Sequence, residues 1–178
     1  MKSDPVSPQG IHAVTVGDVT LTVETPPDLD ALLDRAAARD PQAVDAIPYY
    51  AILWPAARGL AEYLWQHRAE LPGTRVIELG CGLGLPSILA AKLGARVLAT
   101  DFHPEAGEWL LHNAALNDVS LDYRPLDWNA FPDTQHSTLD TRKDSLVIGS
   151  DLVYERRHIP ALVCAIGALC APGGRAVI

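Results

Sequence analysis

The sequence predicts an α/β fold: an open, mostly parallel twisted sheet with helices on both faces. After residue 74, short apolar runs that suit buried strands alternate with segments of helical periodicity, a pattern typical of parallel β-α-β units. Three closely spaced glycines separate the first of these strands from the helix that follows it. Polar residues follow the later strands, at the edge where open α/β sheets bind their ligands. The 178 residues suffice for one such domain with its own core.

Residues 1–46 are predicted to form an N-terminal hairpin and a cap helix ahead of the main domain, residues 47–178. Apolar and polar residues alternate on both sides of Gly17-Asp18, which predicts a β-hairpin over residues 11–24. Leucines at helical spacing follow two prolines and predict a short amphipathic helix that ends near residue 40. We expect this helix to lie across the sheet edge or over the ligand site.

Three large aromatic side chains, Tyr49, Tyr50 and Trp54, lie between two prolines in the next segment. Pro55 biases Trp54 away from helical backbone and can itself open a helix, which is predicted to run to about His67. An indole at the start of this helix is a suitable wall for a ligand group. For Tyr49 and Tyr50, a place in the core and a place in the site both stay open.

The central stretch is Val76-Ile-Glu-Leu-Gly-Cys-Gly-Leu-Gly-Leu-Pro-Ser87. Its apolar start predicts a buried parallel strand, and the Ala-rich run after its proline predicts a helix. Gly80, Gly82 and Gly84 therefore lie on a strand-to-helix turn. Glycine there lets a ligand come close to the backbone, and the helix N-terminus offers unpaired N–H groups.

The details of this turn favour S-adenosylmethionine over a dinucleotide. Leu85 stands where a dinucleotide-binding turn has its third glycine, and Glu78 stands two residues before the first glycine. A carboxylate repels a diphosphate and attracts a ligand with a sulfonium and an amino group. Cys81 could be a nucleophile, but a small residue whose backbone N–H matters is the favoured interpretation. A dinucleotide stays open as the alternative.

Acidic and aromatic residues follow the next two predicted strands. Asp101 ends a strand over residues 95–100 and stands 21 residues after Gly80, where an acid can accept hydrogen bonds from both ribose hydroxyls. The alternative role for Asp101 is the N-cap of the helix predicted over residues 104–116. After the third strand, Asp127 can accept a hydrogen bond from an adenine amine, and Trp128 can stack on its ring.

The last part of the chain is predicted to contain a surface loop, two strands and a helix. Residues 131–145 are polar and predict a mobile loop. The fourth strand, residues 145–154, runs out into Ser150, Asp151 and Tyr154. A helix over residues 157–171 then precedes a last strand that ends at the final residue, Ile178.

Composition excludes several classes of function. The net charge of −8 and the pI of about 5.1 argue against nucleic-acid binding, since no basic stripe is present. No apolar run approaches the roughly 18 residues needed to cross a membrane. The odd number of cysteines, without any C-x-x-C pair, is typical of a reducing compartment. We therefore expect a soluble cytoplasmic protein without a metal site.

With these residues in place, the sequence resembles the class I, seven-β-strand S-adenosylmethionine-dependent methyltransferases, which have a Rossmann-like fold. The resemblance rests on Glu78-Leu-Gly-Cys-Gly-Leu-Gly84 followed by Asp101. More narrowly, it resembles the protein-lysine methyltransferases of methyltransferase family 16, through Leu53-Trp54-Pro55 and Asp151-Leu-Val-Tyr154. This resemblance implies cofactor contacts at Trp54, Gly80, Cys81, Gly82, Asp101, Trp128 and Ser150.

The resemblance also implies that Asp151 and Tyr154 face the substrate, a lysine side chain of a protein partner. Two alternatives stay open: a methyltransferase of the same fold that acts on a small molecule, and a non-catalytic cofactor-binding module. The family's sheet ends with two more strands, whereas this sequence stops at the fifth. We therefore expect either a truncated chain or a sheet that another chain completes, and the sequence leaves the oligomeric state undetermined.

Overall fold

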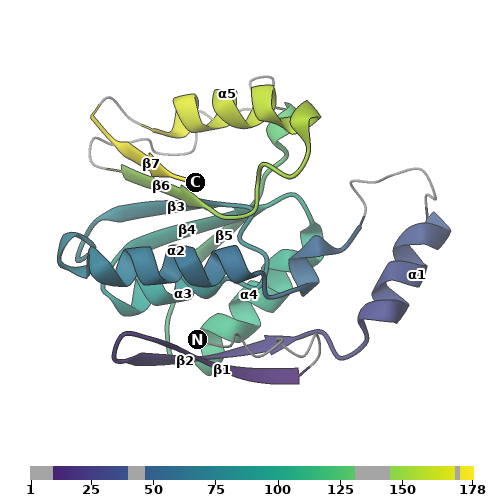
Figure 1. The fold of residues 1–178 in the computed structure, drawn as a ribbon, viewed down its shortest axis with the longest axis horizontal. Coiled ribbons are helices and arrows are strands. Elements are labelled where there is room, and N and C mark those ends of the chain that lie inside the picture. Colours follow the sequence, from purple (N-terminus) through teal and green to yellow (C-terminus); the bar gives the residue numbers. More distant parts are fainter. Residues whose placement is uncertain (1–9, 40–46, 131–144, 171–172) are drawn as a thin grey trace.

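The computed structural model describes residues 10–39, 47–130, 145–170 and 173–178. Within these residues the chain forms a five-stranded sheet, a two-stranded hairpin and five α-helices (Figure 1). The strands are β1 (Gly10–Val16), β2 (Val19–Thr25), β3 (Arg75–Leu79), β4 (Arg96–Asp101), β5 (Asp122–Pro125), β6 (Ser145–Gly149) and β7 (Arg175–Val177). The helices are α1 (Leu29–Arg39), α2 (Pro55–Gln66), α3 (Leu85–Lys92), α4 (Pro104–Leu116) and α5 (Ile159–Leu169).

The large sheet has the order β5-β4-β3-β6-β7, and all its neighbouring strands are parallel, which confirms the predicted fold class. β3 lies at the centre, where Leu79 pairs with Thr100 of β4 on one side and with Gly149 of β6 on the other. The carboxyl ends of these three strands therefore meet at one edge. β6 is shorter than predicted, because the strand ends at Gly149 instead of running on toward Tyr154.

Helices cover both faces of the sheet, and successive residues of β3 divide between them. Val76 packs in the larger core cluster together with residues of α2 and α3, whereas Ile77 and Leu79 pack in a second cluster with residues of α5. Figure 1 shows α2, α3 and α4 on one face and α5 on the other. The period-2 alternation of a strand thus gives each face an apolar layer. In the sequence, by contrast, the apolar residues of β3 look alike, and only Arg75 and Glu78 stand out.

The predicted hairpin forms, and it belongs to the larger core cluster. Val14 and Val16 of β1 and Leu21 and Val23 of β2 are buried there with residues of α2 and α3. Gly17, at the turn of the hairpin, packs so closely on the indole of Trp65 that a Cβ atom would lie 1.9 Å from it. The predicted domain boundary between residues 46 and 47 borders a segment outside the described residues and stays a prediction.

Helix α1 lies to one side of the sheet, near the start of α4 (Figure 1). Leu29 and Leu32 pack against a small buried cluster formed by Tyr50, Ala51 and Ala106. The loop predicted before β6 lies, except for its last residue, outside the described residues. No helix in the described parts of the chain is long and apolar enough to cross a membrane.

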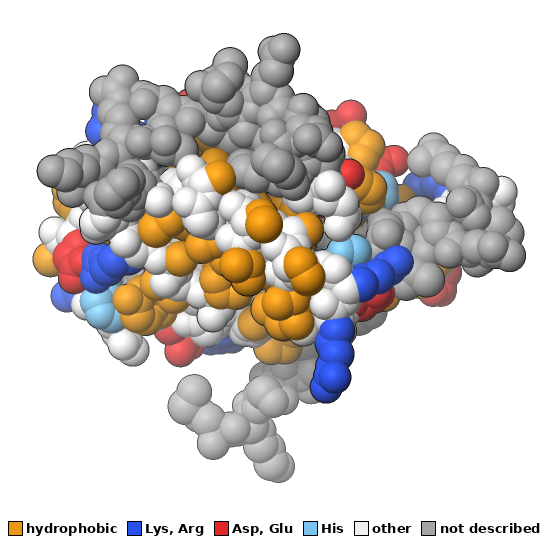
Figure 2. Space-filling view, turned by 90° about the horizontal axis from the view of Figure 1, so that it is seen from above, with side chains coloured by type: hydrophobic (Ala, Val, Ile, Leu, Met, Phe, Trp, Pro, Cys, Tyr) orange, Lys and Arg blue, Asp and Glu red, His pale blue; other side chains and the backbone are white. Residues whose placement is uncertain are grey.

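Helix α5 is apolar on its outer side as well as on the side that faces the sheet. It contains no charged residue, and Ile159 and Val163 on its outer side are 38% and 61% exposed. Figure 2 shows hydrophobic side chains gathered on this face of the molecule. A helix that is apolar all round is more often buried than exposed.

Candidate functional site

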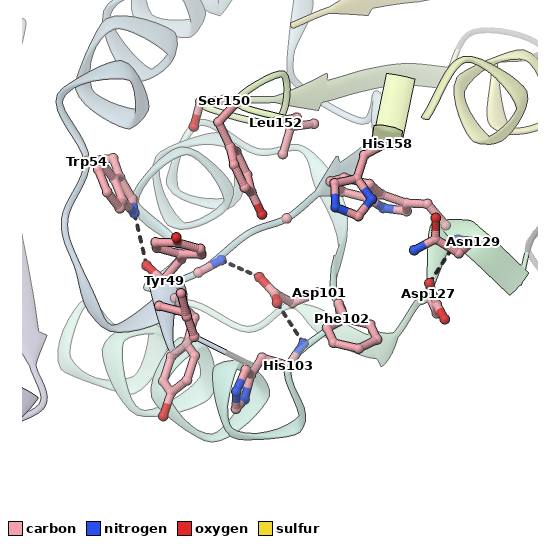
Figure 3. A pocket seen from close by; sticks show the side chains of 16 residues that line it. Tyr49, Trp54, Asp101, Phe102, His103, Asp127, Asn129, Ser150, Leu152 and His158 are labelled. Carbon is pink, nitrogen blue, oxygen red and sulfur yellow. Dashed lines mark hydrogen bonds between the residues drawn. The ribbon is translucent and has the colours of Figure 1, made fainter. Parts of the chain in front are cut away.

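A cleft with about 850 Å³ of empty space, part of it open to solvent, lies at the carboxyl ends of β3, β4 and β6 (Figure 3). The structure brings most of the predicted site residues together here. Those that line the cleft are Trp54, Gly80, Gly82, Asp101, Asp127, Trp128, Ser150 and Tyr154. Glu78, Cys81 and Asp151 do not line it.

The glycine turn forms one wall of the cleft, and its backbone requires glycine. Gly80 has a φ of 62°, in the left-handed region that L-residues with a Cβ atom avoid. A Cβ atom on Gly80 would also lie 2.6 Å from Cδ2 of Leu152. On Gly82, whose φ is 50°, a Cβ atom would lie 3.4 Å from the carbonyl oxygen of Tyr50. The turn thus presents bare backbone to the cleft.

Asp101 is fixed beside this turn by two backbone donors. Its Oδ2 accepts a hydrogen bond from the N–H of Gly82 at 2.9 Å, and its Oδ1 accepts one from the N–H of His103 at 2.9 Å. Burial raises the pKa of Asp101, and the two hydrogen bonds partly offset this effect. The N-cap of α4 is His103, so Asp101 does not have the alternative capping role. Each carboxylate oxygen keeps a further lone pair for a ligand hydroxyl.

Glu78 lies beneath the turn and is only 1% exposed. One of its oxygens, Oε2, accepts hydrogen bonds from the backbone N–H of Ser87 at 3.1 Å and from the Ser87 hydroxyl. Burial raises the pKa of Glu78 to about 8, because the ionised carboxylate loses its hydration, and the charge of Asp101 adds to this effect. Glu78 therefore ties the strand before the turn to the helix after it. Its contact with a cofactor stays a prediction.

Cys81 points away from the cleft into a small buried cluster with Ala99 and Leu110. Its backbone N–H donates to the carbonyl of Thr100 at 2.9 Å, which joins the turn to β4. Burial raises the pKa of the thiol well above its usual value, so the reactive thiolate is disfavoured. These observations favour the small-residue interpretation of Cys81 over a nucleophile.

Aromatic side chains form a second wall of the cleft. The indole Nε1 of Trp54 donates to the carbonyl of Tyr49 at 2.9 Å. The Tyr49 ring lies edge-on to Tyr154, with 5.4 Å between the ring centroids. Tyr50 is only 5% exposed, and burial raises its pKa to about 12. Both tyrosines line the cleft, and Tyr50 also packs in a small buried cluster with Ala51 and Ala106.

Asp127 and Trp128 follow β5 and line the cleft, where the indole of Trp128 lies beside Gly80. Oδ1 of Asp127 accepts a hydrogen bond from the N–H of Asn129 at 2.8 Å, which fixes this carboxylate at the start of a short 3₁₀ turn. Nε1 of Trp128 is buried and has no hydrogen-bond partner among the described residues. Because a buried donor without a partner is costly, this N–H is a candidate contact for a ligand.

The segment after β6 brings Ser150 and Tyr154 to the cleft, while Asp151 lies between two lining residues and is exposed. Asp151 has a φ of 54°, which is uncommon for a residue other than glycine. Left-handed backbone at such a position is often associated with function. Its conformation explains why β6 ends early: the chain turns at this residue.

Six further cleft residues were not predicted: Ile47, Phe102, His103, Asn129, Leu152 and His158. Phe102 directly follows Asp101 and is 50% exposed, so its position after a strand-end acid could have indicated it. Leu152 lies inside the segment Asp151–Tyr154, and its packing against Gly80 depends on contacts that no local pattern reveals. His158 precedes α5, and its place in the cleft likewise follows from the packing of that helix. Among the described residues, no group of His, Cys, Asp and Glu side chains could hold a metal ion.

Together, the parallel sheet and the cleft at its carboxyl edge identify the fold as that of the class I methyltransferases. The T. thermophilus 16S rRNA N2 G1207 methyltransferase, solved with AdoMet and guanosine, is 16% identical with a TM-score of 0.62, over 98% of this chain and 43% of that one. Magnesium protoporphyrin IX methyltransferase from Synechocystis, solved with bound cofactor, is 19% identical with a TM-score of 0.53, over 71% and 57%. At these identities the likeness concerns the fold alone.

The chain belongs to the lysine methyltransferase family known as methyltransferase family 16, which residues 45–178 match. Histone-arginine methyltransferase METTL23 of Xenopus laevis is 34% identical, over 66% of this chain and 50% of that protein. The electron transfer flavoprotein beta subunit lysine methyltransferase of the same organism is 37% identical, over 66% and 45%. Protein N-lysine methyltransferase METTL21A of Danio rerio is 36% identical, over 64% and 52%. The chain thus spans about half the length of the curated relatives it matches.

Membership in this family implies S-adenosylmethionine as the cofactor. The residues present fit it. Asp101 is an acceptor fixed at the cleft, the side-chain-free backbone of Gly80 and Gly82 lines it, and the buried N–H of Trp128 lacks a partner among the described residues. Together they supply an acceptor for hydroxyls, a bare backbone surface and a hydrogen-bond donor on an aromatic wall.

Proposed function

We propose that this protein is an S-adenosylmethionine-dependent methyltransferase that methylates a lysine side chain of a protein. The observation that carries the proposal is the cleft itself. In it the glycine turn and Asp101 adjoin an aromatic wall with Tyr49, Trp54 and Tyr154. The family and its lysine-methylating relatives support the choice of substrate.

Each wall of the cleft has a separate task in this proposal. Asp101 accepts hydrogen bonds from the ribose hydroxyls, and the glycine turn lets the ligand lie against the backbone. Asp127 and Trp128 hold the adenine, and Trp54 closes the other end. When bound, S-adenosylmethionine supplies an electrophilic methyl group on a positively charged sulfur.

Asp151 and Tyr154 handle the incoming amine. The exposed carboxylate of Asp151 attracts a lysine ammonium and orients it by a hydrogen bond, and Tyr154 with Tyr49 forms an aromatic channel. A neutral amine is needed for transfer, because an ammonium has no lone pair. A carboxylate raises the pKa of a neighbouring amine, so Asp151 is a positioning group here and not a simple base.

Arginine is the second candidate substrate, because METTL23, at 34% identity, is named as a histone-arginine methyltransferase. The two substrates are separated by incubating a protein extract with labelled cofactor and identifying the labelled amino acid by mass spectrometry. Label on lysine supports the proposal, and label on arginine supports the second candidate. Label confined to the small-molecule fraction contradicts both.

The role of Asp151 is tested by Asp151→Asn, which removes the charge and keeps the shape. We expect methyl transfer to fall on the order of a hundredfold while affinity for S-adenosylhomocysteine stays nearly unchanged. The matched control is Asp118→Asn, because Asp118 is also exposed, also has a φ of 54° and lies at the far end of α4. Normal turnover by Asp151→Asn would refute the role assigned to this carboxylate.

A further inference from the structure

Asn113 in α4 and Asn117, the residue that caps the C-terminus of α4, bind the outer edge of the N-terminal hairpin. The side chain of Asn117 accepts from the N–H of Thr22 at 2.8 Å and donates to the Thr22 carbonyl at 2.7 Å. The side chain of Asn113, one helical turn earlier, accepts from the N–H of Glu24 at 2.8 Å and donates to its carbonyl at 3.1 Å. Each amide thus takes the place of a neighbouring strand for one residue of β2. Figure 1 shows α4 beside β2.

The two asparagines differ in their third hydrogen bond. Nδ2 of Asn117 donates to the carbonyl of Asn113 in α4 at 2.7 Å. Nδ2 of Asn113 donates to the carbonyl of Leu83 at 3.1 Å, and Leu83 lies in the glycine turn. Asn113 is fully buried, and all its amide hydrogens and its oxygen have partners.

The same face of α4 also packs against the turn through Leu110, whose Cδ1 would lie 2.1 Å from a Cβ atom on Gly84. Asn113 therefore joins three parts of the molecule: the hairpin, α4 and the turn that forms a wall of the cleft. We propose that Asn113 is a positioning residue for the cofactor, which holds the glycine turn in place through its hydrogen bond to the Leu83 carbonyl. This inference rests on the proposed function, because it assumes that the cleft binds S-adenosylmethionine.

The mechanism is a restriction of the turn. The N–H of Gly82 already donates to Asp101 in front of the turn, and the Leu83 carbonyl on the next residue accepts from Asn113 behind it. Two successive residues are thus held from opposite sides by different elements. Without the bond from Asn113, the buried Leu83 carbonyl loses a partner, and the peptide that carries it can rotate away from the geometry that the cleft requires.

The test compares Asn113→Ala with Asn117→Ala, because each substitution removes two hydrogen bonds to β2 and one further hydrogen bond. Both variants should unfold at a lower temperature than the wild type. Affinity for S-adenosylhomocysteine, measured by calorimetry, should fall about tenfold for Asn113→Ala, which corresponds to about 1.4 kcal/mol. It should stay within about twofold of the wild type for Asn117→Ala. At saturating cofactor, the turnover rates of the two variants should differ little from each other.

The other possible results also decide whether Asn113 positions the turn. Equal affinities in the two variants would overturn the inference, because they would leave Asn113 with a role in the hairpin only. If either alanine variant does not fold, the pair Asn113→Ser and Asn117→Ser replaces it, since serine keeps a donor, and the same difference in affinity is required. A wild-type protein that does not bind S-adenosylhomocysteine would instead refute the proposed function, which separates that failure from the failure of this inference.

Discussion

Glu78→Gln tests whether the buried acid beneath the glycine turn is neutral in the folded protein. Glutamine has nearly the shape of a protonated glutamate, and its oxygen can still accept from Ser87. The pKa of Glu78 is raised from 4.5 to about 8, with burial as the largest cause. Between these two values the folded protein holds a proton that the unfolded chain has lost. Stability conferred by this group is therefore present at low pH and is lost as the pH rises toward 8.

The size of the effect follows from the two pKa values. The free energy of unfolding falls by about 1.36 kcal/mol per pH unit while the folded state binds one more proton than the unfolded state. From pH 5 to pH 8 the loss adds up to roughly 3–4 kcal/mol, because the slope flattens near each pKa. Glu78 is only 1% exposed, so solvent screening reduces this value little. The Gln variant should lack this loss.

The measurement is urea unfolding at pH 5, 6, 7 and 8, followed by tryptophan fluorescence. The stability of Glu78→Gln relative to the wild type should rise by roughly 3–4 kcal/mol across this range. The matched control is Glu108→Gln, which changes an exposed glutamate of α4 and should show no such trend. A constant difference between Glu78→Gln and the wild type would mean that Glu78 is ionised in the folded protein, and the argument from burial would be wrong.

Two further substitutions test the walls of the cleft. Gly80→Ala places a Cβ atom on a backbone with a φ of 62° and 2.6 Å from Leu152, so we expect it to lower the free energy of unfolding by about 1–3 kcal/mol. The control is Gly59→Ala in α2, whose added Cβ has no atom near it. This substitution should raise the free energy of unfolding by about 0.5–1 kcal/mol. Equal effects of the two substitutions in urea unfolding would contradict the assigned turn geometry. Trp128→Phe removes the indole N–H that lacks a partner among the described residues. Calorimetry should find that this variant binds S-adenosylhomocysteine about tenfold more weakly, while its melting temperature changes little. Unchanged affinity would show that this N–H does not contact the ligand.

The sequence predicts the order of strands and helices well, because each element carries its own local signal. Helix α4 begins and ends at the predicted residues, 104 and 116, since a proline opens it and an apolar stripe fills it. The meeting of the glycine turn with Asp101 was also predictable. Parallel neighbouring strands bring their carboxyl ends to the same edge, and the spacing of the turn and the acid fits one β-α-β unit.

What the sequence does not reveal depends on contacts between distant residues. Nothing local distinguishes the half-buried Tyr49 from the buried Tyr50, because the difference arises from what packs against each ring. The link between Asn113 and Leu83 joins residues 30 positions apart and follows from how α4 lies on the turn. The same limit applies to Glu78. Its sequence position predicts a charge near the ligand, whereas its burial determines its protonation.

These contacts explain how a short turn can present a fixed surface to a ligand. Hydrogen bonds from three separate elements hold the chain around it: Glu78 binds Ser87 beneath it, Asp101 binds Gly82 in front, and Asn113 binds Leu83 behind. A turn fixed in this way before the ligand arrives loses little conformational entropy on binding, which favours affinity. If the turn is pre-organised, its backbone amides should resist hydrogen exchange in the free protein almost as well as in the complex with S-adenosylhomocysteine. Strong protection that appears only on binding would show instead that the ligand, and not these three hydrogen bonds, orders the turn.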